Sequence, residues 1–262
     1  MYNQQPVQLL KIMKEASNIA EVISQQDAVI EWAITNQSRA GYFAVLYKKM
    51  TLAVQAAIGA AQFEESLRME KLIIHFANYY LQAWNGYVHK QTICKAWQQV
   101  FEYTESNKLV VLQQLILGIN THINLDLAKA AVQTCPGDAI YDLKNDFEKI
   151  NDIIAELTQD VQACLEKIWW PLKLLTNITN NQHKAVLNFS IHNARKASWA
   201  NALALSMVQG TMKENHILIM QKMVIEISKR IIHPGSITLF LLKPVLWMEP
   251  KKISSIINSL QE

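Results

Sequence analysis

The stretch "LQQLILGINTHINLDLAKA", residues 112–130, decides the fold of this chain. Its apolar residues recur every three or four positions, which is the period of an α-helix, and strand-like alternation is absent. The pattern covers residues 108–134 and stops at "CPG", residues 135–137, where proline and glycine end a helix. A helix that is apolar over much of its circumference belongs at the centre of a helical protein.

The same spacing recurs through the rest of the chain, and turn-forming residues are scarce, with seven glycines and six prolines. We therefore predict an all-α protein, a single domain over residues 1–262 that forms a bundle of about seven to nine helices. Residues 250–262 are predicted to be a terminal helix or a mobile tail. The further predicted helices cover residues 42–58, 67–84, 138–170 (continuous or broken once), 180–210 and 215–232.

The composition is that of a globular protein, with 50% hydrophobic and 18% charged residues among 262. A chain of this length can bury roughly 75% of the surface that its unfolded form exposes, which is enough for one large core. Basic residues number 25 and acidic residues 22, so the formal net charge is +3, and no basic run occurs. This balance argues against an electrostatic nucleic-acid binder.

The three cysteines, Cys94, Cys135 and Cys164, are far apart and show no Cys-x-x-Cys spacing. A disulfide framework or a zinc knuckle is therefore not expected, and free thiols in a reducing compartment fit better. The first residues lack the basic start and apolar run of a secretory signal. No apolar run approaches the roughly 20 residues that span a bilayer. Together these features predict a cytoplasmic protein.

Polar residues interrupt the apolar pattern of the central stretch. His122 and Asp126 are four residues apart and share one helical face, and Gly118 lies one turn earlier on that face. Since glycine costs about 1 kcal/mol in mid-helix relative to alanine, a closely approaching neighbour is a plausible reason for Gly118. Asn120 and Asn124 form a second pair on a different face. Each buried polar group needs a partner, because one left unsatisfied costs roughly 1–3 kcal/mol.

The His122–Asp126 pair allows three interpretations. The pair is a base with the carboxylate that orients it, or it forms one edge of a divalent-metal site. In the third interpretation His122 is a core histidine satisfied by a carboxylate, and the asparagines join neighbouring helices. A metal site needs further ligands, and no second motif of this kind stands out in the sequence.

A second polar set lies in "NFSIHNARKASWANA", residues 188–202, where His192, Arg195 and Trp199 line one helical face. An arginine beside an indole suits a carboxylate or phosphate, and the alternative is a stacked helix surface. A third set lies in "YDLKNDFEKINDII", residues 141–154. There Asp146 borders an apolar face and is predicted either to complete a site with His122 or to be solvated.

Other features carry less information about chemistry. Tyr79 belongs to a group of aromatic residues that either packs in the core or lines a pocket, and His75 one turn earlier reads as a core histidine. The chain has no dinucleotide-binding glycine motif, no phosphate-binding P-loop and no Gly-x-Ser-x-Gly elbow.

Five stretches in order resemble a largely bacterial family, domain of unknown function 5995: "GYFAVLYKKMTLAV", "AWQQVF", "GINTHINLDL", "NDFEKINDII" and "ARKASWANA". The resemblance covers about residues 38–205, leaving residues 1–35 and the last 50 residues outside. Within that range the chain is similar to the family in an Asn-x-His-Ile-Asn-x-Asp-Leu pattern and in an Ala-Arg-x-x-x-Trp pattern. His75 and His192 match neither. The resemblance implies a family-typical set of Asn120, His122, Asn124, Asp126, Asp146, Asn151, Arg195 and Trp199.

The predicted function is an enzyme that acts on a largely apolar small molecule, lipid-, isoprenoid- or polyketide-like, in a buried pocket by acid–base, cyclase or isomerase chemistry. A metal-dependent hydrolase or oxygenase with His122 and Asp126 as ligands is one alternative. A non-enzymatic module that binds an apolar ligand or a protein is another. The predicted catalytic residues are His122, Asp126, Asp146 and Arg195, and the predicted substrate contacts are Asn120, Asn124, Asn151, Trp199, Tyr79 and His192.

Overall fold

The computed structural model describes residues 12–106, 108–154, 182–234, 247 and 252–262, and these ranges are mostly helical, with turns between the helices and no strand among them. The prediction of an all-α single domain is confirmed. Residues 144–154 are also helical. The elements are α1 (Ile19–Thr35), α2 (Ala40–Gly59), α3 (Ser66–Val88), α4 (Lys95–Thr104), α5 (Val111–Thr121), the π-helix η1 (His122–Asp126), α6 (Leu127–Thr134), the 3-10 helix η2 (Gly137–Leu143), α9 (Gln182–Ser206), α10 (Gly210–Ile232) and α12 (Ile253–Gln261).

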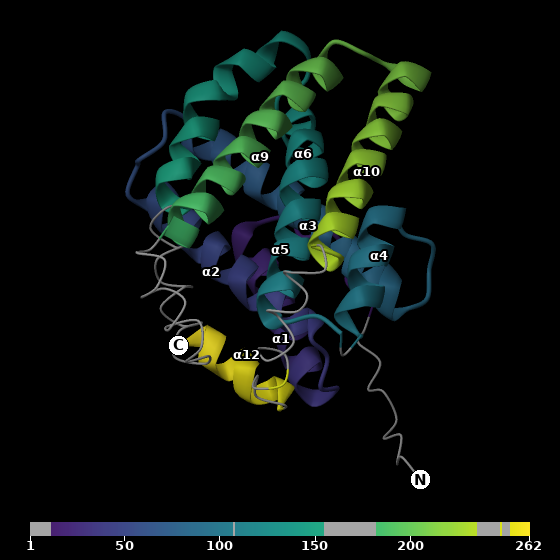
Figure 1. The fold of residues 1–262 in the computed structure, drawn as a ribbon. Coiled ribbons are helices and arrows are strands. Elements are labelled where there is room, and N and C mark those ends of the chain that lie inside the picture. The colour runs from purple at the N-terminus through teal and green to yellow at the C-terminus, as the bar shows by residue number, and fades with distance from the viewer. Residues whose placement is uncertain (1–11, 107, 155–181, 235–246, 248–251) are drawn as a thin grey trace.

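The central rod consists of α5, η1 and α6, which follow one another without interruption. Figure 1 shows it running through the middle of the molecule with α9 and α10 alongside. Helices α2, α4 and α10 pack on α5, while α3 and α9 pack on α6. The predicted central position of this stretch is therefore confirmed. The five π-helical residues were not foreseen, and such turns inside α-helices occur frequently at functional sites.

Gly118 allows α2 to approach this rod closely. A Cβ atom at Gly118 would lie 2.4 Å from the ring of Phe43, so only glycine admits the ring at this distance. The sequence predicted such a neighbour on the face that also carries His122. The contact lies where α2 crosses α5, and it brings the ring of Phe43 next to His122 in the π-helical turn.

The N-terminal part of the chain closes one end of the bundle. Helix α1 begins with an N-cap in which Asn18 Oδ1 accepts a hydrogen bond from the Glu21 amide (2.8 Å). It packs on α2 and α3, and α12 lies against α1 and α2 at the lower end of Figure 1. The terminal helix expected within residues 250–262 is therefore present.

Some predicted helix boundaries differ from those observed. The helix predicted from residue 138 begins as the 3-10 helix η2, and its predicted continuation from residue 155 to 170 lies outside the described residues, as does Cys164. The predicted segment 215–232 is five residues too short at its start, since α10 begins at Gly210. No described helix is long and apolar enough to cross a membrane. Cys94 and Cys135 are free thiols.

Candidate functional site

His122 and Asp126 meet inside the central rod, as their spacing predicted. The distance from His122 Nδ1 to Asp126 Oδ2 is 3.1 Å, and the two residues are 2% and 1% exposed. The π-helical turn holds both ends of this contact, because it begins at His122 and ends at Asp126. A buried pair of this kind is held by the backbone on both sides, which limits the rotamers that either side chain can adopt.

Two further side chains bind the carboxylate of Asp126. The indole Nε1 of Trp97 on α4 donates to Oδ2 (2.8 Å), and the Lys129 ammonium on α6 contacts Oδ1 (3.4 Å). Both carboxylate oxygens therefore have partners, and one partner is a cation. This arrangement favours the ionised form of a carboxylate that has left water.

The charges of the pair follow from these contacts. Burial alone would raise the pKa of Asp126, but Lys129, His122 and Trp97 together lower it below its ordinary value. Burial also lowers the pKa of His122, and the hydrogen bond that its Nδ1 donates to Asp126 offsets only part of that effect. The resting pair is thus an ionised aspartate and a neutral imidazole. Since an ionised carboxylate only accepts, the imidazole proton lies on Nδ1 and leaves a lone pair on Nε2.

Five aromatic rings surround the imidazole of His122. The ring of Phe76 stacks on it with centroids 3.6 Å apart, and the ring of Tyr47 meets it edge-on at 4.5 Å. The rings of Phe43, Tyr80 and Trp97 lie at 5.9–6.0 Å. The walls of the site are therefore aromatic on several sides, and water is largely excluded.

Polar atoms inside this aromatic shell lack partners among the described residues. They are Nε2 of His122 and the hydroxyl oxygens of Tyr47 and Tyr80, each fully buried. Burial raises the pKa of Tyr47 and of Tyr80 above the ordinary value, so both hydroxyls keep their protons and can donate. One acceptor and two donors are thus free in the centre of the fold. Buried polar groups without partners call for an explanation, and a ligand is one.

Asn120 and Asn124 hold α10 against the rod. The Asn124 amide donates to Asn120 Oδ1 (3.0 Å), and Asn120 Nδ2 donates to the Val224 carbonyl (3.1 Å) and to Ser228 Oγ (3.0 Å). These bonds match the interpretation in which asparagines join helices. The predicted contact of either residue with a substrate remains a prediction.

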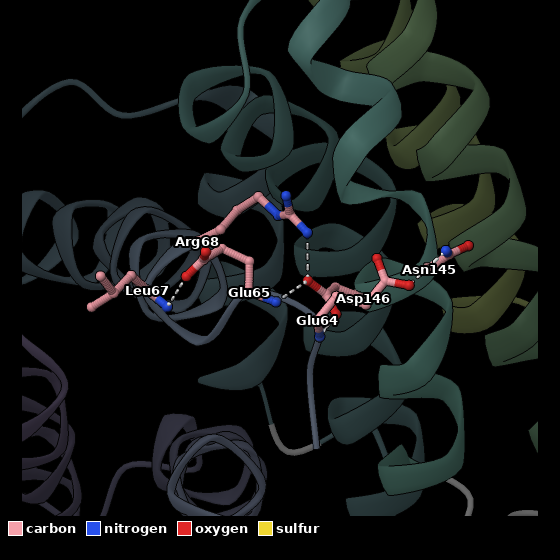
Figure 2. Close-up of polar contacts among 6 residues, drawn as sticks. All are labelled: Glu64, Glu65, Leu67, Arg68, Asn145 and Asp146. Atoms are coloured by element: carbon pink, nitrogen blue, oxygen red, sulfur yellow. Dashed lines mark hydrogen bonds and ion pairs between the residues drawn. The ribbon is translucent and has the colours of Figure 1, made fainter. Parts of the chain in front are cut away.

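Asp146 binds the chain at the start of α3, and no hydrogen bond or ion pair among the described residues links it to His122. Its carboxylate accepts from the backbone amides of Glu64 (2.7 Å) and Glu65 (3.2 Å) and from Arg68 Nη2 (2.7 Å). Figure 2 shows the carboxylate between the Arg68 guanidinium and the chain at Glu64 and Glu65. A carboxylate at the N-terminus of a helix satisfies free N–H groups and complements the helix dipole. Asp146 therefore anchors the segment that leads into α3, whose own N-cap is Glu65.

Arg195 forms a second buried polar centre, away from any acidic partner among the described residues. Its Nε donates to Asn151 Oδ1 (2.6 Å), its Nη2 donates to the Phe147 carbonyl, and its guanidinium lies over the Phe147 ring. The ring of Trp199 packs against the same Phe147 ring (5.0 Å). Arg195, Asn151 and Trp199 thus form one cluster between α9 and the helical residues 144–154.

The other predicted site residues lie outside both centres. The Tyr79 hydroxyl donates to Gln133 Oε1 (3.0 Å). The Lys129 ammonium, which also contacts Asp126, lies over the Tyr79 ring, so Tyr79 borders the His122 centre. His192 is exposed on α9. His75 Nδ1 pairs with Thr134 Oγ1 (3.0 Å), in agreement with a bonded core histidine.

Sequence reasoning did not single out several residues of the His122 centre. Five of them come from α2, α3 and α4, and nothing in local spacing connects these five to residue 122, whereas the sixth, Lys129, lies three residues after Asp126 on α6. One available signal was Trp97, since a tryptophan in a short helix needs a partner for its N–H when it is buried. The missed residues are Phe43, Tyr47, Phe76, Tyr80, Trp97 and Lys129.

A small cavity lies next to the aromatic shell, between the start of α2 and helices α3, α4 and α5. It has room for about 10 Å³, the volume of one water molecule. Its lining includes Phe43, Tyr80 and Trp97, which also face His122. The remaining lining residues are Arg39, Ala40, Val100, Phe101, Thr104 and Gln114.

The model of a family described as a family of unknown function (DUF5995) matches residues 19–234. The chain belongs to this family. The DUF5995 match runs from the start of α1 to the end of α10, so the limits of 38 and 205 expected from the sequence were too narrow at both ends. Both buried centres lie inside the DUF5995 region. No curated protein and no solved structure matches the chain.

Proposed function

We propose that this protein is an enzyme in which His122 acts as a general base on a largely apolar small molecule. The observation that carries the proposal is the buried Nε2 atom of His122, which has no partner among the described residues while Nδ1 is held by Asp126. An imidazole that is fixed on one side and free on the other is the arrangement that general bases share.

The electrostatics support proton transfer at Nε2. The imidazole is neutral at rest, because burial lowers the pKa of His122. When Nε2 takes a proton, the imidazolium lies 3.1 Å from the Asp126 carboxylate and stacks on the Phe76 ring. A carboxylate and an aromatic face both stabilise a cation. The imidazole is therefore uncharged at rest, and Asp126 and Phe76 offset part of the cost that burial places on the imidazolium.

The substrate class follows from the walls. Five rings surround the imidazole, and the free hydrogen-bonding groups near it are the hydroxyls of Tyr47 and Tyr80. Such walls favour an apolar body with one oxygen function that a tyrosine hydroxyl polarises. In this proposal Asp126 orients the base, and Asp146 and Arg195 support the fold.

The ligand set supports the metal-free version of the chemistry. The centre offers one imidazole and one carboxylate, and that carboxylate already binds Trp97 and Lys129. No group of three or more histidine, cysteine or acidic side chains within the described ranges is arranged to hold a metal ion. A catalytic zinc or iron site draws on about three protein ligands.

A search for consumed compounds tests the proposal. Purified protein is incubated with an organic-solvent extract of cells, and compounds that disappear are identified by mass spectrometry. We expect His122→Gln to lower their turnover by roughly 10²–10⁴-fold, which is the usual contribution of a general base. His75→Gln is the matched control, because His75 is bonded to Thr134 outside the aromatic shell. Turnover that survives in His122→Gln contradicts the proposal.

The small size of the cavity favours a second candidate, a non-enzymatic module in which the polar centre is structural. A space of about 10 Å³ does not admit an apolar substrate without movement of the surrounding rings. This candidate predicts that His122→Gln lowers stability and that wild-type protein consumes no compound from the extract. The two candidates therefore differ in the wild-type arm of the same experiment.

A further inference from the structure

The cavity next to the aromatic shell combines an apolar inner wall with polar groups near its rim. Of its nine lining residues, Arg39 is the half-exposed one and the other eight are buried. Arg39 therefore marks the mouth of the cavity. Its inner wall consists of Phe43, Tyr80 and Trp97, whose other sides face the imidazole of His122.

Two buried polar atoms among the lining residues lack partners within the described part of the chain. They are Gln114 Oε1 and the Tyr80 hydroxyl, on residues that are 3% and 1% exposed. The Gln114 amide group is oriented by its other end, since Nε2 donates to the Leu109 carbonyl (2.9 Å). Leaving such atoms unsatisfied costs free energy, so each calls for a small polar partner such as a water molecule.

The guanidinium of Arg39 is not neutralised by the described residues. Its side chain makes no ion pair or hydrogen bond within the described ranges. The carboxylate of Glu105 accepts a hydrogen bond from Oγ of Ser38, the residue before Arg39 (2.6 Å). A free guanidinium at the mouth of a cavity attracts a planar oxyanion, which it can bind through two parallel N–H groups.

We propose that this cavity is the outer end of the substrate channel and that it binds the carboxylate of a small apolar carboxylic acid. Arg39 holds the carboxylate at the mouth, and the apolar body points inward along Phe43, Tyr80 and Trp97. A water molecule in the cavity donates to Gln114 Oε1. The inference rests on the proposed function only in naming His122 as the group beyond the rings, and it specifies the class of substrate.

Entry of such a ligand requires the inner rings to move, because the resting cavity has the volume of one water molecule. The Phe43 ring is the least free of the three, since it packs against the backbone at Gly118. Tyr80 and Trp97 come from α3 and α4, which contact each other less extensively than they contact the rest of the bundle. Ligand binding is therefore expected to change the surroundings of Trp97 and of the His122 ring.

The experiment uses hexanoate and hexan-1-ol as probes for the full-length protein. Calorimetric titration compares wild type with Arg39→Gln and with Arg230→Gln, an exposed arginine on α10 that removes the same charge elsewhere. We expect saturable binding of hexanoate that Arg39→Gln weakens about tenfold or more, as for the loss of a charged hydrogen-bonding pair. Arg230→Gln should bind as wild type does, and hexan-1-ol should bind equally to all three proteins.

The proposed carboxylate site is overturned if hexanoate shows no saturable binding, or if Arg39→Gln and Arg230→Gln bind hexanoate equally. Nuclear magnetic resonance of the His122 ring supplies the second readout, because an apolar tail against Phe43 and Tyr80 must shift its signals. An unshifted His122 ring with bound hexanoate also overturns the channel. Hexanoate binding by His122→Gln separates the two proposals, since it leaves this inference standing when the catalytic role of His122 fails.

Discussion

Two of the buried ionisable centres in the described part of the chain, those of Asp126 and Arg195, are built in opposite ways. Asp126 is an anion with three donors, and one of them, Lys129, is a cation. Arg195 is a cation, 3% exposed, whose partners are two neutral oxygens and an aromatic face. In the first centre the negative charge of Asp126 is stabilised by three side chains, which are held in place by their bonds to it. The second retains a charge that the described surroundings do not neutralise.

The direction of each pKa shift records this difference. The pKa of Asp126 is lowered because its partners outweigh burial. The pKa of Arg195 falls to about 9 because burial acts on it without an opposing charge. A charge stabilised by many partners can orient a reactive group such as His122. A charge bonded to neutral oxygens on a neighbouring helix mainly joins two helices, and this is the role that the structure supports for Arg195.

Removing Asp126 tests the first centre most severely. In Asp126→Ala the Trp97 indole, the Nδ1–H of His122 and the Lys129 ammonium lose their shared acceptor inside the core. Breaking a buried pair by removing one partner costs about 3–5 kcal/mol in the free energy of unfolding. Urea denaturation measures the loss. Asp152→Ala is the control, since this aspartate is exposed and pairs with Lys149 at the surface, where about 0–1 kcal/mol is expected. Equal losses of unfolding free energy in both variants would show that the buried contacts of Asp126 contribute no more to stability than a surface ion pair does.

Trp97→Phe isolates one donor of the same centre. The ring contacts with Phe43 and Tyr80 are largely kept, while the hydrogen bond to Asp126 Oδ2 is lost. A hydrogen bond to a charged group contributes about 1.5–3 kcal/mol, so the free energy of unfolding should fall by that amount. The pKa of Asp126 should rise, because one of the groups that lower it is gone. Trp84→Phe is a matched control in the same core, since the Trp84 N–H has no partner among the described residues.

Arg195→Met tests the second centre and should cost less at neutral pH. The variant leaves Asn151 Oδ1 and the Phe147 carbonyl without a donor, but it also removes a desolvated charge, so we expect a net loss of about 1 kcal/mol. The loss should grow above pH 9. Above that pH the folded wild type loses the cost of the buried charge, while the unfolded chain keeps its proton to higher pH. A loss that is constant between pH 8 and 10 would show that Arg195 stays protonated in the folded state.

How much of this contrast can be read from the sequence depends on whether the partners are local. His122 and Asp126 are four residues apart on one helix, and Gly118 one turn earlier admits Phe43, so spacing predicted these relations. Helix periodicity in the same stretch also predicted the all-α fold. Asp146 was expected at the rim of a site, yet it binds the segment that leads into α3, at Glu64 and Glu65, 81 to 82 residues away.

Long-range partners are not predictable because they depend on how helices cross. Arg195 was placed with His192 on one helical face, but the structure turns Arg195 inward to Asn151 and leaves His192 exposed. The π-helical turn at residues 122–126 was not predicted either, since apolar spacing does not distinguish a short π-helical turn from an α-helix. Of the donors to Asp126, His122 and Lys129 are local, but Trp97 belongs to α4, so that hydrogen bond emerges only when α4 meets the rod.

Lys129→Met should have the smallest effect and gives the sharpest view of the first centre. Lys129 is 20% exposed and 3.4 Å from Asp126 Oδ1, so its loss should cost less than about 1 kcal/mol in the free energy of unfolding. The pKa of His122 should nevertheless rise, because the ammonium lowers it, and nuclear magnetic resonance titration of the ring measures this directly. In the wild type, stability falls as the pH drops below 6.5, because the unfolded chain binds a proton that the buried imidazole resists. Raising the folded pKa towards 6.5 must make this acid loss smaller in Lys129→Met than in the surface control Lys149→Met. An unchanged acid loss would mean that burial alone sets the proton affinity of His122, and that the cation beside Asp126 does not tune the base.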